Sequence, residues 1–527
     1  MNTTKSRSEI RLTADIDEEP EPRRAEAIEG RPFVIVVLGD FRGAAEDASL
    51  QQSGSLGTRR LLSVDRDNLD EMLARLNVRW EGVIEGSPGA AAAGARVQLL
   101  LQEIEDFSPD RIVQQILPLR LLLETRAALE DPSHFDSAAS EVMKWAQPAP
   151  GPNRTAEAAP VLTPPPGMEP SALLDLILGG SSTGAARSTQ ETWCTDFHRF
   201  LQDVVGPYLI RVDTAKQAVL IDAVDRALSH QLRVVLQDSS FKRLEATWRS
   251  MHWLTSNTET GADLNILMVH VTKDELMRDM DDHVSPNESG LAHLLLESTS
   301  IPGGRVPALL VGNYEFDHSL EDLALLERIG SIAQRLKAPF VAAAGPSLLG
   351  LESFNELSSL RDLERRMGDS AHDAWRALRD SPQARWLALA LPRVLCRLPY
   401  GPETKAAESF KFEETVAGCT HEELLWGNPA FRVAGVVAAA FATNGWSLSF
   451  AGGVSRLEGL PLYVYRDLGE TVSKPCAEVF ISERIVEMLE EAGLVPLVSH
   501  RDADVIALPC LQSLGLPRCP LSWSGQL

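Results

Sequence analysis

The sequence contains no apolar run of the ~18 residues that a membrane-spanning helix requires. Residues 1–30 are polar and mixed in charge, so they lack the apolar centre of a secretory signal. The six cysteines are scattered without C-x-x-C spacing, which argues against a zinc site and against a disulfide framework. We therefore predict a cytoplasmic protein with reduced thiols, no metal and no membrane insertion.

Basic residues are also in short supply. Asp and Glu outnumber Lys and Arg by 74 to 50, which gives a formal net charge of −24. A chain this acidic repels phosphate backbones, so we expect no nucleic-acid binding, and we interpret the charge as an aid to solubility. The length of 527 residues indicates roughly three domains.

Four short patterns come close to a catalytic or metal-binding motif, and each is incomplete. Gly179–Arg187 lacks the Gly-Lys-Ser/Thr of a phosphate loop, and Ser347 is not in a Gly-x-Ser-x-Gly context. His421 is followed by two glutamates but not by the second histidine of a zinc helix. The acidic cluster Asp279–His283 lacks the glycine and the closing glutamate of a calcium loop. We predict that the protein is not an enzyme and that it has neither catalytic residues nor a cofactor.

Composition divides the chain into five parts. We expect a disordered tail over residues 1–30 and a small α/β unit over 31–145. A Pro-rich linker follows over 146–170, because prolines exclude helix and central strand there. A short amphipathic helix over 171–180 then precedes a larger α/β unit over 181–527. The predicted fold class is α/β, with a mixed sheet flanked by helices in the larger unit.

Periodicity predicts the main elements of the small unit. The continuous apolar run Phe33–Leu38 predicts a buried strand, and a second strand is expected near Leu61–Val64. Asp67 is expected to cap a helix whose apolar face contains Leu69, Met72, Leu73 and Leu76. A further strand over Val97–Ile104 and a helix that begins at Ser108-Pro109 complete the unit.

The larger unit shows the same alternation. Ile221 to Val235 marks a long amphipathic helix, and Leu320–Leu336 marks another. The strand candidates are Leu264–Val271, Pro307–Val311, Phe340–Ala344 and Trp386–Ala390.

The small unit resembles the small sheath subunit of type VI secretion systems. Three stretches carry this resemblance in the order in which the family has them: Pro32–Phe41, Val64–Glu71, and Glu105–Arg111 followed by Pro118-Leu119-Arg120.

From about Ser171 onward the chain resembles the large sheath subunit of the same systems. The stretches that carry this second resemblance are Phe241–Arg249, Val269–Glu275, Leu310–Phe316, Ala338–Ala343, Leu391-Pro392-Arg393, Leu398–Thr404 and Leu425–Asn428. Asn313 stands where the family usually has Asp. Turn-forming residues beside large aromatics suit packing better than chemistry.

The resemblance implies two intertwined α/β units in a structural component of a contractile sheath, which surrounds and propels an inner tube. It implies as partners other sheath subunits, the inner tube protein, an AAA+ ATPase that recycles the sheath, and baseplate components. The chain departs from the family in two ways. The two subunits are fused, and the large-subunit part stops soon after Leu494–Leu497, so we expect it to be truncated at its C-terminal end. The alternative is a sheath-like capping, initiating or regulatory protein that binds sheath subunits without polymerising.

The short helix over 171–180 is the candidate site. Leu173, Leu174, Asp175, Leu176, Ile177 and Leu178 match, in position and pattern, the helix that the recycling ATPase grips in the resembled large subunits. The leucines and Ile177 form i,i+4 pairs that suit docking into an apolar groove. An equally weighted alternative is that this helix covers part of its own domain.

Overall fold

The structure is a computed structural model that describes residues 31–43, 56–84, 95–145, 217–300, 305–361, 363–367, 372–415, 421–448, 450, 454–467, 470–521 and 523. We call residues 31–145 the first segment and residues 217–523 the second segment. The predicted tail over 1–30, the linker over 146–170 and the helix over 171–180 lie outside the described residues. Those three assignments and the domain boundaries stay predictions.

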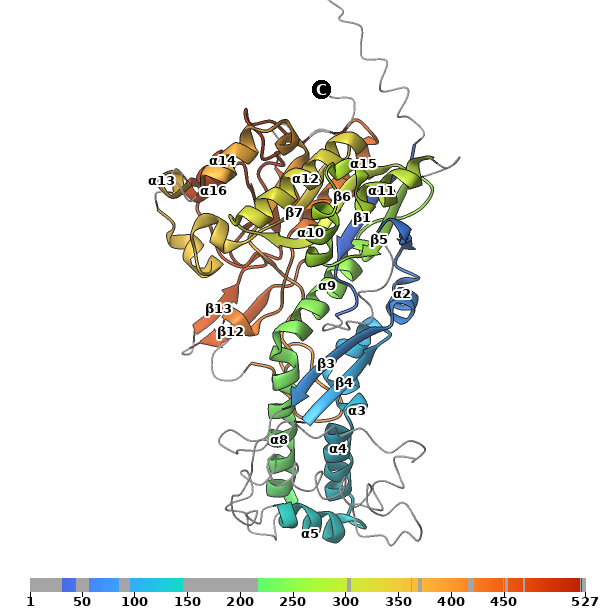
Figure 1. The fold of residues 1–527 in the computed structure, drawn as a ribbon. Coiled ribbons are helices and arrows are strands. Elements are labelled where there is room, and N and C mark those ends of the chain that lie inside the picture. The colour runs from blue at the N-terminus through green and yellow to red at the C-terminus, as the bar shows by residue number, and fades with distance from the viewer. Residues whose placement is uncertain are drawn as a thin grey trace, which may run out of the picture.

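A seven-stranded sheet forms the centre of the molecule, in the strand order β14-β8-β7-β6-β1-β5-β2 (Figure 1). Its strands are parallel except for β2, which runs antiparallel to β5 at one edge. The bounds are β1 Phe33–Gly39, β2 Leu62–Val64, β5 Leu264–His270, β6 Pro307–Phe316, β7 Phe340–Ala344, β8 Leu387–Leu391 and β14 Val495–Pro496.

The first segment supplies a central strand of this sheet. β1 pairs with β5 from Phe33 opposite Leu264 to Gly39 opposite His270, and with β6 on its other side. All seven of its residues are buried, as expected for a parallel strand covered on both faces. The predicted intertwining of a small α/β unit with a larger mixed sheet flanked by helices is therefore confirmed.

Alternate residues of β1 face two different helical layers. Phe33, Ile35 and Val37 belong to the core shared with α8, α9 and α15, whereas Val34 and Val36 belong to the core shared with α10, α11 and α12. The bounds of these helices are α8 Gln217–Gln237, α9 Ser239–Ser256, α10 Lys273–Asp281, α11 Gly290–Ser300, α12 Leu320–Leu336 and α15 Ala430–Asn444.

The rest of the first segment extends away from the sheet along α9 and α8 (Figure 1). β3 and β4 form an antiparallel ribbon, and α4 packs beside α8. The bounds are α2 Leu69–Leu76, β3 Val78–Ile84, β4 Ala95–Leu101, α3 Pro109–Gln115, α4 Leu117–Glu130 and α5 Phe135–Trp145.

Short elements complete the second segment. Three small sheets pair β9 with β10, β12 with β13, and β16 with both β11 and β15. Their bounds are β9 Val394-Leu395, β10 Trp426-Gly427, β11 Ser455–Leu457, β12 Tyr463–Asp467, β13 Glu470–Lys474, β15 Val498-Ser499 and β16 Ile506–Leu508. The remaining helices are α13 Leu363–Met367, α14 Asp373–Asp380 and α16 Glu483–Glu491. Short 3-10 turns occur at η2 Leu56–Thr58, η3 Ile104–Phe107, η4 Pro286–Glu288, η5 Pro346–Leu349, η6 Phe354–Ser359, η8 Pro382–Trp386 and η9 His421–Glu423.

Several boundaries and one cap assigned from the sequence are wrong. The strand expected over Val97–Ile104 ends at Leu101, and Ile104 opens the 3-10 turn η3. Asn68, not Asp67, occupies the N-cap position of α2. The carboxylate of Asp65 accepts hydrogen bonds from the amides of Asp67 and Asn68 at 3.0 and 2.9 Å, so the turn before α2 is organised by an earlier residue. Trp386 ends a 3-10 turn instead of opening β8, which begins at Leu387.

Among the residues that the structure describes, no helix has the length and apolar character needed to cross a bilayer.

Candidate functional site

The surface along which the two segments meet is the candidate functional site, because it brings together most of the stretches that carry the family resemblance. It has two parts. In the sheet junction, β1 and β2 pair with β5 and β6. In the helical junction, α3 and α4 lie against α8, and Asp110 of α3 contacts residues 408–409 of the second segment. Helix α9 runs from one part to the other.

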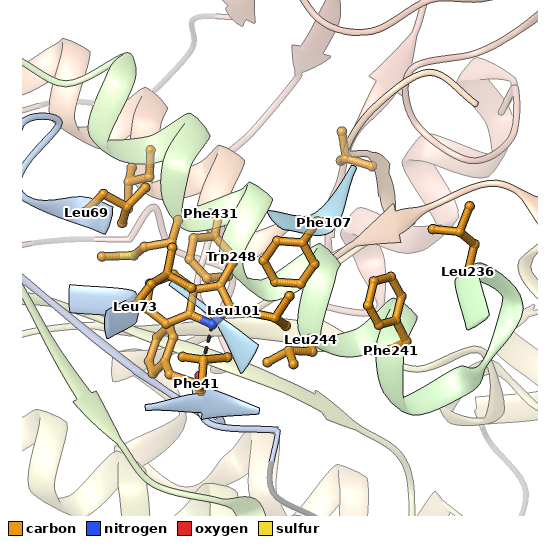
Figure 2. Close-up of a cluster of buried hydrophobic side chains, with 14 of the residues drawn as sticks. Phe41, Leu69, Leu73, Leu101, Phe107, Leu236, Phe241, Leu244, Trp248 and Phe431 are labelled. Carbon is orange, nitrogen blue, oxygen red and sulfur yellow. Dashed lines mark hydrogen bonds between the residues drawn. The ribbon is translucent and has the colours of Figure 1, made fainter. Parts of the chain in front are cut away.

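Aromatic side chains fix α9 to the first segment (Figure 2). The indole Nε1 of Trp248 donates to the backbone oxygen of Phe41 at 2.9 Å, and the two rings lie 5.6 Å apart edge to face. Trp80 of β3 contacts Phe241 edge to face at 5.5 Å. Its Nε1 donates to Asp238 and Ser240 at the start of α9. Each buried indole thus has both an apolar surface and a hydrogen-bond partner.

The start of α9 is capped by the same aspartate that Trp80 contacts. Asp238 accepts from the amides of Ser240 and Phe241, both at 2.9 Å, as an N-cap residue does. Burial acts to raise the pKa of Asp238, but its hydrogen bonds outweigh burial and hold that pKa below its ordinary value. The first segment therefore contacts the polar end of α9 as well as its apolar face.

A buried ionic network, which we call the Glu245 network, lies beside these aromatic contacts, since Glu245 follows Phe241 by four residues on α9. Arg397 donates to Glu245 at 2.7 Å and to Glu414 at 2.7 Å. Arg249 also donates to Glu245, at 2.6 Å, and reaches the Tyr400 hydroxyl at 2.9 Å. Burial acts to raise the pKa of Glu245, but the two guanidinium groups outweigh it and hold that pKa below its usual range.

A second ionic group, centred on Glu478, fixes the turn that precedes β10. Arg393 donates to Glu478 at 2.8 Å, and His421 Nε2 lies 2.7 Å from the same carboxylate. The His421 ring also stacks on Trp426 at 5.1 Å. Gly427 has no room for a side chain, since an added Cβ would lie 2.3 Å from the sulfur of Cys396. The Trp426-Gly427-Asn428 signature is therefore a packing feature.

The family-like stretch Leu310–Phe316 contains an irregularity in β6, which nearby asparagine side chains stabilise. The register of β6 against β7 shifts between Val311 and Glu315. Asn428 Nδ2 donates to the backbone oxygens of Gly312 and Tyr314 at 3.3 and 3.1 Å, which satisfies the displaced backbone. Asn313 Nδ2 donates to Thr247 of α9 at 2.8 Å. Several signatures that are distant in sequence thus converge on α9.

An ion pair and two hydrogen bonds close the sheet junction at the carboxyl end of β5. Arg59 of the first segment donates to Glu275 at 2.6 Å and to the backbone oxygen of His270 at 2.6 Å. His270 Nδ1 accepts the Phe41 amide at 3.1 Å. Burial lowers the pKa of His270 to about 4, so the ring is neutral at neutral pH and can accept this hydrogen bond.

Apolar side chains of α3, α4 and α8 belong to one buried core at the helical junction, and charged side chains cross it as well. Arg126 of α4 donates to Asp225 of α8 at 2.6 Å. Asp110 of α3 accepts the amides of Glu408 and Ser409 at 3.1 and 3.0 Å. Lys405 forms an exposed ion pair with Glu105 at 3.1 Å.

Of the four incomplete catalytic motifs, Gly179–Arg187 lies outside the described residues, and the structure places the other three. Asp279 caps α11 through the amides of Gly290 and Leu291 at 2.8 and 3.0 Å. Ser347 lies within the short turn η5. In the described part of the chain, no group of three or more His, Cys, Asp or Glu side chains is arranged to hold a metal ion.

One arrangement looks like a catalytic triad and is not. Ser133 and Asp131 approach His134 in an exposed turn, but both contact the same ring nitrogen, Nδ1, at 3.0 and 2.8 Å. A proton relay needs the serine and the carboxylate on opposite ring nitrogens.

The predicted site residues Leu173, Leu174, Asp175, Leu176, Ile177 and Leu178 lie outside the described residues. Sequence reasoning missed Arg397, Glu414 and Glu478, the charged side chains on which the two ionic groups depend. One signal was available for Arg397, since it follows the apolar run Val394-Leu395-Cys396 shortly before the turn-forming Pro399-Tyr400-Gly401.

Comparison with known proteins agrees with this division into two segments. Residues 218–515 match the VipB family (EvpB/VC_A0108, tail sheath N-terminal domain). Residues 5–136 match the VipA family (Type VI secretion system, VipA, VC_A0107 or Hcp2). The chain is similar to the type VI secretion system sheath protein TssC1 of Pseudomonas aeruginosa, with 34% identity over 304 residues. That similarity covers 56% of this chain and 61% of the relative.

Proposed function

This chain belongs to the tail sheath proteins of type VI secretion systems, with small-subunit-like and large-subunit-like parts in one polypeptide, and we propose that it is a building block of the contractile sheath that surrounds and propels an inner tube. The intertwined sheet supports this proposal best. Because β1 lies between β5 and β6, the two parts form one rigid subunit that can transmit force without separating at the sheet junction.

Electron microscopy of the purified full-length chain tests the proposal directly. We expect tubular polymers, either from the chain alone or after addition of sheath subunits of the same secretion system. The alternative role predicts that the chain binds at the ends of such polymers, or sequesters subunits, without forming tubes. A chain that neither polymerises nor binds sheath subunits would contradict both roles.

Sheath proteins assemble with other sheath subunits, and we propose the inner tube protein, baseplate components and a recycling AAA+ ATPase as further partners. Residues 173–178 are our candidate for the segment that the ATPase recognises. The support is the pair of i,i+4 apolar contacts available on so short a helix, which is marginally stable without a groove to dock into.

A pull-down with the N-terminal domain of the ATPase tests this assignment. Leu174→Asp combined with Leu178→Asp should remove binding and leave the fold intact. Asp175→Asn is the matched control, because it keeps both apolar pairs and should bind like the parent. The recognition role is wrong if the double variant unfolds or binds as well as the parent does.

We assign the protein to the cytoplasm and give it no catalytic step, cofactor or metal. The family is a structural one, and the charged groups described above contact one another and the backbone. Alanine substitution of Ser347, His421 or Asp282 should change no turnover of any substrate, and loss of a hydrolytic activity in one of these variants would overturn the assignment.

A further inference from the structure

β12 and β13 form a two-stranded ribbon at the lower left of the body in Figure 1. Such a ribbon is marginal on its own, and here one face is anchored. Tyr463 stacks on Tyr465 at 5.3 Å, and it is buried in a cluster with Leu395, Leu424 and Trp426. Ser473 donates to Asp502 at 2.7 Å. The ribbon is therefore held in one orientation.

The hydrogen-bonding pattern of the ribbon identifies the groups on its outer edges. Asp467 and Glu470 face each other across a two-residue connection, so they are the hydrogen-bonded closing pair. Antiparallel pairs alternate, so the backbone groups of Thr471 and Ser473 on β13 point away from β12. Outside the β12–β13 ladder, neither of these two amides donates a hydrogen bond to another described residue. Among the described residues, β13 is therefore an open edge strand.

The sequence of β13, Glu470-Thr471-Val472-Ser473-Lys474, is complementary to itself when two copies run antiparallel. With Val472 on the two-fold axis, Glu470 of each copy faces Lys474 of the other, and Thr471 faces Ser473. The residues that must exchange backbone hydrogen bonds in this register are Thr471 and Ser473, whose backbone groups point outward. Neither Glu470 nor Lys474 forms an ion pair in the described part of the chain.

We propose that β13 is a self-association edge, through which two copies of this chain join their ribbons into one four-stranded antiparallel sheet. The outer edge of β12 does not suit this contact, because a two-fold axis at Tyr465 would place Asp467 opposite Tyr463 and Arg466 opposite Val464. A contact limited to five residues per copy lies at the small end of protein interfaces, so the dimer should be weak and transient.

Sedimentation velocity of the unpolymerised full-length protein over a concentration series tests the proposal. The parent should show a reversible monomer–dimer equilibrium. Glu470→Lys or Lys474→Glu alone places like charges opposite each other twice and should weaken association about tenfold or more. The double exchange, Glu470→Lys with Lys474→Glu, should restore it. A 1:1 mixture of the two single variants should also dimerise, because each then complements the other.

Crosslinking tests the register independently. Val472→Cys places two thiols opposite each other on the axis, within disulfide reach, so mild oxidation should give a covalent dimer. Thr471→Cys is the matched control, since it faces Ser473 and should crosslink no more than the parent. A parent that stays monomeric, a double exchange that fails to restore association, or equal crosslinking of the two cysteine variants would overturn the proposal. The contact does not rest on the sheath role, so its failure would leave tube formation unaffected.

Discussion

The sheet junction and the helical junction join the same two segments by different physical means. At the sheet junction, a fully buried strand exchanges backbone hydrogen bonds with two neighbours. At the helical junction, apolar side chains of α4 and α8 pack in a shared core, and charge pairs such as Arg126 with Asp225 connect helices that keep their own backbone hydrogen bonds. Loss of β1 would leave β5 and β6 with unsatisfied backbone and an open core, whereas loss of an ion pair leaves both helices complete.

This difference indicates which junction between the two segments can tolerate small displacements. A strand register is all or nothing, because a one-residue slip exchanges the two faces of β1. The helical junction can tolerate small displacements, because side-chain packing between complete helices can shift without breaking a hydrogen-bond ladder, and its exposed Lys405–Glu105 pair can re-form at little cost. We therefore expect substitutions to have effects that decrease from the sheet junction through the Glu245 network to the helical junction.

The largest effect is expected from Val36→Asp at the centre of β1. An unpaired carboxylate would be buried between two helical layers and two strands, so the free energy of unfolding should fall by more than about 4 kcal/mol. Soluble yield and circular dichroism measure this loss. Val284→Asp, at a residue that is 99% exposed, is the control and should be neutral. A folded Val36→Asp protein would break the distinction between the junctions.

The second effect concerns the Glu245 network. Arg397→Met leaves Glu245 buried with one guanidinium partner instead of two, which should cost about 3–5 kcal/mol at neutral pH. Denaturation in urea measures it, with the exposed Arg335→Met as control.

The pH dependence of that variant gives the sign of the electrostatic contribution. The pKa of Glu245 is lowered in the folded parent, so its stabilisation is present above the ordinary glutamate pKa of ~4.3 and is lost as pH falls through the folded-state value. The stability difference between parent and Arg397→Met should therefore narrow below about pH 4.5. A difference that stays constant to pH 3 would show that lost packing, not charge, is responsible.

A smaller effect is expected from Arg126→Met at the helical junction. Asp225 loses its guanidinium partner, but burial already outweighs that partner and raises the pKa of Asp225, so this pair contributes less than the Glu245 pairs, which lower the pKa of Glu245. The expected loss is about 1–2 kcal/mol, read from the urea midpoint. A loss as large as that of Arg397→Met would mean that the helical junction tolerates change no better than the buried network does.

The smallest effect is expected from Lys405→Ala. Lys405 and Glu105 are each 59% exposed in their side chains, so the pair should contribute less than about 1 kcal/mol and less again in high salt. Thermal unfolding at low and high salt measures the contribution of this ion pair. A salt-independent loss of stability above about 1 kcal/mol would contradict the expected difference between the two junctions.

Helices and strands whose apolar residues recur at regular spacing could be predicted from the sequence. Leu320–Leu336 and Phe340–Ala344 have in the structure the bounds that their sequence predicts, because capping residues and apolar spacing act locally. The capping error at Asp67 arose because three nearby polar side chains compete for the same turn. The ribbon strand Val78–Ile84 was missed even though Val78 and Trp80 alternate with charged residues.

The arrangement of the site was not predictable from local pattern. Nothing in Phe33–Leu38 specifies that its neighbours are strands hundreds of residues away, and the family resemblance alone suggested intertwining. Arg397 and Glu414 acquire their roles only when the chain is folded, because each partner is brought there by a separate element.

The central position of β1 also has a consequence for synthesis of the chain on the ribosome. Phe41, just past β1, meets a partner 229 positions later in the chain. At about 5–20 residues per second, β1 is made roughly 10–50 seconds before β5 and β6 exist. During that interval a seven-residue apolar strand has no sheet to enter, so nascent chains should need a chaperone or a temporary partner. Fusion ensures that the strand, once its neighbours emerge, meets those of its own molecule first.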